Sequence, residues 1–188
     1  MAEMRASQLK EDLVALGSLG HEAAARILAE LPPAHLKVIE RSTRVDWLPV
    51  EVDVALVQVI HAEVGDEGLR HWGREALRRS FESSALRPLI TTVARVFGLS
   101  PAALLKAAPQ AWRATFRGCG ELSVEEASGG LVVRLVGLPS QLHHRPFQLS
   151  IGGSLEAVFD LAKVDGHIRL VEPGGLAEAR YEVSWTEA

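Results

Sequence analysis

The sequence predicts an α+β fold in which a helical bundle, residues 1–117, precedes an antiparallel ββαββ unit, residues 118–188. In the first part, apolar residues recur mainly at helical spacing. In the second part they alternate with polar residues, as in strands with one buried face. The alternation is clearest in the last strand, at Ala179, Tyr181, Val183 and Trp185. We expect one domain over residues 1–188, because this length suits a single core.

The first predicted helices are short. Ser7 is a candidate N-cap for a helix that stops near Gly17. A second helix covers residues 21–31 and ends at two prolines, and a third covers residues 34–40. The residues that we expect to face inward in the first two are Leu9, Leu13, Leu16, Ala24, Ile27, Leu28 and Leu31.

Residues 50–64 fit two periodicities. Alternation predicts a strand, whereas a stripe with a spacing of four predicts a helix: Val52, Leu56, Ile60 and Val64. Pro49 stands where a helix would begin and Gly65 where it would end. The segment is also long for a strand. We therefore predict a helix.

Three more helices are predicted, over residues 67–82, 85–97 and 101–117. Gly73 lies on the apolar face of the first, where its missing side chain would let another backbone approach. Pro109 predicts a kink or a break in the last, which Ser100 caps. The inward-facing residues of the first two should be Leu69, Trp72, Gly73, Ala76, Leu77, Leu86, Leu89, Ile90, Val93 and Phe97.

The ββαββ unit begins after Gly120 with two alternating segments that turn at residues 128–130. A loop then leads to a helix that we expect Ser150 to cap. Its apolar stripe is Ile151, Leu155, Val158, Phe159 and Ala162. A second hairpin starts at His167 and turns at residues 173–175. We expect the last strand to pack against this helix, because each has one apolar face to bury.

Composition excludes some classes of partner. The chain has 20 basic and 24 acidic residues and a net charge of −4, which argues against a nucleic-acid binder. No apolar run is as long as a membrane span, and residues 1–10 lack the apolar core of a signal peptide. The single cysteine, Cys119, fits a reducing compartment. We therefore expect a cytoplasmic protein that binds neither nucleic acid nor a membrane.

The candidates for catalysis or metal binding have plainer explanations. Cys119 follows a helix C-terminus, whose dipole opposes a thiolate. His143 and His144 are adjacent in a loop, which is poor spacing for one metal ion. Acidic residues dilute the arginines of residues 67–82, so that surface is expected to be a solvated helix face. Gly152 and Gly153 lack the lysine and further glycines of a phosphate loop and indicate close packing. We predict no catalytic residue, no metal site and no enzymatic activity.

Aromatic residues on several helices offer the best candidate site. Trp72, Trp112 and Phe116 could line a cavity for a small apolar ligand between the helices and the sheet. Side chains of this kind also form ordinary cores. Both interpretations stay open at this point.

A family resemblance adds to these observations. It rests on Gly65 and on five stretches: residues 46–49, 69–73, 118–122, 151–159 and 181–185. They resemble an uncharacterised family of myxobacterial paralogues of about 180 residues. More distantly, helices followed by ββαββ are similar to the haem nitric-oxide-binding fold and to four-vinyl-reductase-type domains. The resemblance implies a sensory or ligand-binding module.

Haem binding does not carry over with the resemblance. The haem-binding branch uses a histidine on the helix before the sheet and a Tyr-x-Ser-x-Arg strand. Residues 101–117 contain no histidine, and residues 121–125 read Glu-Leu-Ser-Val-Glu. We therefore expect no cofactor. The sequence favours a non-enzymatic sensory or regulatory module for a small apolar ligand. The alternative is a protein-interaction module without a ligand, such as one that forms a homodimer.

Overall fold

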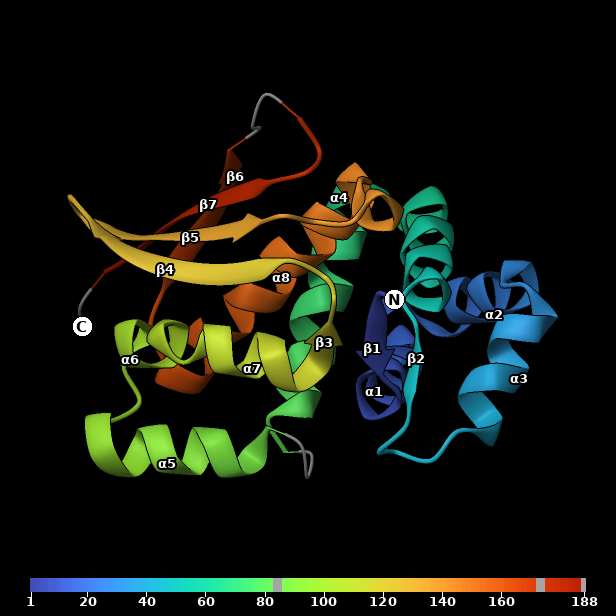
Figure 1. The fold of residues 1–188 in the computed structure, drawn as a ribbon, viewed down its shortest axis with the longest axis horizontal. Coiled ribbons are helices and arrows are strands. Elements are labelled where there is room, and N and C mark those ends of the chain that lie inside the picture. Colours follow the sequence, from blue (N-terminus) through green and yellow to red (C-terminus); the bar gives the residue numbers. More distant parts are fainter. Residues whose placement is uncertain (83–85, 172–174, 187–188) are drawn as a thin grey trace.

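The computed structural model describes residues 1–82, 86–171 and 175–186, and its elements follow the predicted order (Figure 1). The α+β class is confirmed. Helices α1 to α7 belong to the first part of the chain, and α8 lies between two hairpins in the second. The helices before the hairpins are α1 (Ala6–Ala15), α2 (His21–Glu30), α3 (Pro33–Arg41), α4 (Glu51–Ser80), α5 (Arg87–Phe97), α6 (Pro101–Lys106) and α7 (Ala108–Thr115).

The ambiguous segment of residues 50–64 is helical, as predicted. It continues into the next predicted helix, so both form α4, with a kink at Gly65. The φ of Gly65 is 68°, a left-handed conformation that favours glycine. The break predicted at Pro109 is also present, because residues 101–115 form two helices, α6 and α7. Ser100 caps α6 by accepting a bond from the Ala103 N–H at 3.2 Å.

A small sheet in the first part was not predicted. Strand β1 (Glu3–Arg5) pairs antiparallel with β2 (Trp47–Pro49) and with β3 (Phe116–Arg117). These strands have two or three residues each, too few to show a period of two. The sheet joins the start of the chain to the end of α7, which brings α1 close to the second part of the molecule (Figure 1).

The second sheet has the strand order β4-β5-β7-β6, and every pair is antiparallel. Its strands are β4 (Glu121–Ala127), β5 (Gly130–Val136), β6 (Gly166–Val171) and β7 (Ala179–Trp185). Helix α8 (Arg145–Ala162) covers one face of this sheet and also lies along α4 (Figure 1). Tyr181 and Val183 of β7 are buried with Leu155 and Phe159 of α8 in one core, as expected.

Two predicted caps are wrong. Helix α8 begins at Arg145, where Pro146 occupies its first turn, and Ser150 lies inside the helix. Its hydroxyl donates to the Phe147 carbonyl at 2.8 Å. Ser7 also lies inside its helix, because α1 begins at Ala6. In both cases the chain becomes helical before the serine, since tertiary contacts outweigh the local capping preference.

Two residues predicted to face inward are exposed instead. The exposed fraction is 40% for Leu28 and 71% for Phe97. Their helices, α2 and α5, bury only one narrow face each, at Ile27 and Val93.

The turn predicted at residues 173–175 falls mostly on residues 172–174, which are outside the described residues. Within the described part of the chain, no helix is both long and apolar enough to cross a membrane.

Candidate functional site

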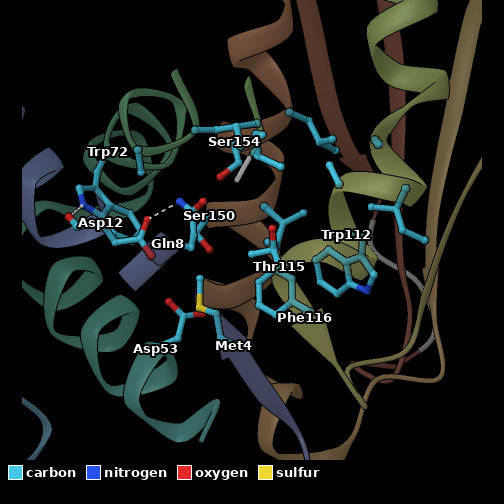
Figure 2. Close-up of a pocket in the computed structure, with 18 residues that line it drawn as sticks. Met4, Gln8, Asp12, Asp53, Trp72, Trp112, Thr115, Phe116, Ser150 and Ser154 are labelled. Carbon is cyan, nitrogen blue, oxygen red and sulfur yellow. Dashed lines mark hydrogen bonds between the residues drawn. The ribbon is translucent and has the colours of Figure 1, made fainter. Parts of the chain in front are cut away.

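A cavity of about 110 Å³ lies where α1, α4, α7 and α8 meet the two sheets (Figure 2). An engineered cavity of about 150 Å³ is enough to hold benzene. The space therefore suits a molecule of roughly one ring. Its lining residues are Met4, Gln8, Asp12, Asp53, Trp72, Ala76, Leu77, Leu86, Ala108, Ala111, Trp112, Thr115, Phe116, Leu122, Ser150, Ile151, Ser154 and Leu155.

All three aromatic residues predicted from the sequence line this cavity. Trp112 and Phe116 stack with their ring centroids 4.1 Å apart and their planes 27° from parallel. The indole N–H of Trp112 donates to the Gly120 carbonyl at 3.2 Å, which fixes the ring. Trp72 lies on the other side of the cavity (Figure 2). Their contact with a ligand stays a prediction.

The side of the cavity near Trp72 is polar. Asp12 of α1 and Asp53 of α4 both line it, with exposed fractions of 3% and 4%. Burial raises the pKa of Asp12 well above its usual range, and the neighbouring charge of Asp53 raises it further. Burial also raises the pKa of Asp53 to about 7. The apolar surroundings thus favour the protonated form of both carboxyl groups.

A short chain of hydrogen bonds orients one of these carboxyl groups. The Ser80 hydroxyl donates to Gln8 Oε1 at 2.7 Å. Gln8 Nε2 in turn donates to Asp12 Oδ1 at 2.8 Å (Figure 2). The indole N–H of Trp72 donates to the backbone carbonyl of Asp12 at 3.0 Å. Asp12 is therefore fixed through both its side chain and its backbone, and Gln8 faces it with its amide donor.

Two hydroxyl groups of α8 also belong to the polar side, and the Thr115 hydroxyl of α7 lines the cavity as well. Ser150 donates to the Phe147 carbonyl at 2.8 Å, and Ser154 donates to the Gly73 carbonyl at 3.2 Å. A hydroxyl has one proton and two lone pairs. With their protons engaged, both groups have only acceptor capacity left for a bound molecule.

Sequence reasoning missed the buried carboxyl groups, although a signal exists. Asp12 follows Leu9 by three positions and precedes Leu16 by four, which places it on the apolar face of α1. Asp53 precedes Leu56 by three positions and Val57 by four, which places it on the apolar face of α4. A carboxyl group at an apolar position of an amphipathic helix is a candidate for a buried polar site.

The other candidates from the sequence lie outside the cavity. Cys119 is buried, its thiol donates to the Arg117 carbonyl at 3.1 Å, and burial raises its pKa to about 11. This supports a structural role. His61 Nε2 lies 2.7 Å from Asp66 Oδ1, and His143 Nε2 lies 2.8 Å from the Leu138 carbonyl. In the parts of the chain that the structure covers, no cluster of three potential metal ligands is found.

Two of the arginines of residues 67–82 hold α4 to α8, whereas Arg78 and Arg79 pair with Glu75 within α4. Arg70 pairs with Glu156, and Arg74 binds Asp160 through two hydrogen bonds of 2.6 and 2.7 Å. The two glycines of α8, Gly152 and Gly153, lie against β7 and α4 respectively. Gly153 touches the backbone of Arg70, and Gly152 lies against the ring of Tyr181. The close packing predicted for the glycines therefore joins α8 to both α4 and the sheet.

Haem does not fit the residues of the cavity. Met4 alone of the usual axial-ligand types lies among the described lining residues, which include no histidine, lysine or arginine. Tyr181 is engaged elsewhere, because its hydroxyl donates to the Gln148 carbonyl at 2.9 Å. The described lining offers propionate groups no cation to pair with, and a porphyrin is several times larger than the molecule of roughly one ring that the space suits.

Similar structures share the whole architecture. The Fe(II) unliganded H-NOX protein from K. algicida superimposes with a TM-score of 0.67 and 14% identity, covering 98% of each chain. An oxygen-binding H-NOX domain related to soluble guanylate cyclases gives 0.62 and 12%, covering 98% of this chain and 96% of the other. No family model matches the chain, and no curated protein does. At this identity the likeness establishes the fold alone: the chain has the fold of the H-NOX domains.

Proposed function

We propose that the protein is a non-enzymatic sensory or regulatory module that holds a small, mainly apolar ligand in the cavity described above. The observation that carries the proposal is the cavity itself, lined by Trp72, Trp112 and Phe116. Its lining joins residues of α1, α4 and α7 to residues of α8 and β4. A ligand there would stabilise one packing of these elements, and that is how binding becomes a signal.

The comparisons support the general class. The similar structures are described as H-NOX proteins, and one is an oxygen complex. The lining of this cavity does not suit haem. We therefore propose an organic molecule of about one ring as its ligand. The size follows from the cavity volume and the apolar part from its aromatic and aliphatic lining.

Thermal unfolding with saturating toluene tests the proposal. Toluene should raise the melting temperature, because a ligand that binds the native state stabilises it. Ala111→Leu should abolish this effect by filling the space, since Ala111 lines the cavity. Ala114→Leu is the matched control: it lies on the same helix, is exposed and should leave the response unchanged. Equal toluene responses in all three proteins, or none in the wild type, would contradict the proposal.

A native mass spectrum of the purified protein adds a second test. A bound molecule released on unfolding would identify the ligand directly. The same spectrum reports the stoichiometry of the chain. A stable dimer without any bound molecule would favour the interaction-module alternative.

A further inference from the structure

The polar side of the cavity accepts hydrogen bonds and donates few. The protons of Ser150 and Ser154 are engaged by backbone carbonyls. Gln8 Nε2 already donates to Asp12, which leaves one amide proton. The carboxyl groups of Asp12 and Asp53 make up the rest of this side, whereas the Thr115 hydroxyl lies beside Trp112 and Phe116 (Figure 2). A molecule that fills the cavity would therefore find acceptors at this end and apolar surface at the other.

Asp53 is the unpartnered member of this group. Its side chain is 4% exposed and lines the cavity, yet no hydrogen bond or ion pair of its carboxyl group is found within residues 1–82, 86–171 and 175–186. A buried polar group normally has a hydrogen-bond partner, because leaving it without one is unfavourable. A ligand in the cavity is the group placed to provide that partner.

We propose that the ligand carries a small cationic head, an ammonium or amidinium group, which binds Asp12 and Asp53 while its apolar body packs against Trp112 and Phe116. This inference rests on the proposed function of the cavity. It narrows the ligand to a class of small aromatic or aliphatic amines. Figure 2 shows the two carboxyl groups on one side of the cavity and the two rings on the other.

Charge favours a cation over other head groups. The titratable residues that line the cavity are Asp12 and Asp53, and the described lining contains no basic side chain that could neutralise them. Glu11 also raises the pKa of Asp12, although it is itself paired with Arg44. An anionic head would meet like charge. A neutral hydroxyl would donate one bond at most, whereas an ammonium group donates three and would compensate the buried carboxylates.

Benzylamine is a suitable probe, because one ring and one methylene match the space. At about pH 8 its ammonium form predominates. Benzyl alcohol and toluene are neutral probes of similar shape. Calorimetry should give benzylamine an affinity at least tenfold above that of benzyl alcohol, about the value of one charge-assisted hydrogen bond. Proton release into the buffer should accompany binding of the amine, since the Asp12 carboxyl group, whose pKa burial raises well above its usual range, must ionise.

Conservative variants separate this inference from the proposed function. Asp53→Asn and Asp12→Asn should each weaken benzylamine at least tenfold and leave toluene binding intact. Asp165→Asn is the matched control, because Asp165 is exposed and lies outside the cavity. The proposal of a cationic head is wrong if toluene binds but benzylamine binds no more tightly than benzyl alcohol. It is also wrong if the two Asp→Asn variants bind benzylamine as tightly as the wild type does. In both cases the apolar site stands. If no probe binds, the proposed function fails as well.

Discussion

The backbones of Gly73 and Ser150 are in direct contact between α4 and α8: a Cβ atom on Gly73 would lie 2.5 Å from the Ser150 carbonyl oxygen. Ser154 strengthens this contact, because its hydroxyl donates to the Gly73 carbonyl. Both serines also line the cavity. The close approach of the two helices thus forms one wall of the proposed binding site.

Gly73→Ala should destabilise the protein by about 1–3 kcal/mol, although alanine is the better helix former. The added methyl group would meet backbone atoms that move only with a whole helix. Urea unfolding measures this change. Gly17→Ala is the control, because a Cβ there would meet nothing within 4 Å, and it should stay within about 0.5 kcal/mol. Equal stability of both variants would show that α4 and α8 adjust freely.

The contact at Gly73 shows how far sequence reasoning reaches. The periodicity of residues 67–82 places Gly73 on the apolar face, and the structure confirms a close neighbour there. Nothing in that pattern identifies α8 as the neighbour. Local periodicity determines which residues an element buries, whereas the partner depends on contacts between distant segments.

The same limit explains the outcome for the site. Trp72, Trp112 and Phe116 were found because large aromatic side chains stand out in a sequence and must be buried somewhere. The polar side could not be predicted as a unit, since Asp12 and Asp53 belong to different helices that meet only in the folded chain. Strands β1 and β2 also place Met4 at the cavity, and they are too short to leave a pattern.

Trp185→Ala should cost about 1–3 kcal/mol, less than full burial would imply. The residue packs against the main core but is only partly buried, because it ends β7 opposite Gly166. Arg180→Ala, on the other face of the same strand, should stay within about 0.5 kcal/mol. Its side chain makes a 3.3 Å bond to Glu182 near the surface. Urea unfolding in which Arg180→Ala is the more damaging change would contradict the assignment of the two faces.

The purified protein should be colourless, and adding haem should produce no Soret band. The reason is the chemistry of the cavity, which offers Met4 as its one common axial-ligand type and two carboxyl groups where propionates would need cations. Absorption spectroscopy after haem titration measures this. A Soret band that disappears in Met4→Ala would show that the cavity opens to accept the macrocycle.

Asp53→Asn should raise stability at neutral and higher pH. Burial raises the pKa of Asp53 from its ordinary value near 4 to about 7, so the folded protein retains a proton that the unfolded chain has lost. The free energy of unfolding contributed by this group therefore falls as pH rises through that window and levels off above it.

Asparagine cannot ionise, so the stability of the variant relative to the wild type should increase across the same window, by on the order of 1–3 kcal/mol. Urea unfolding between about pH 4 and about pH 8 measures the difference between the variant and the wild type. Asp165→Asn, which changes an exposed carboxyl group, should run parallel to the wild type. If Asp53→Asn also ran parallel, the Asp53 carboxyl group would titrate normally in the folded protein, and the unpartnered acid in the cavity would need another explanation.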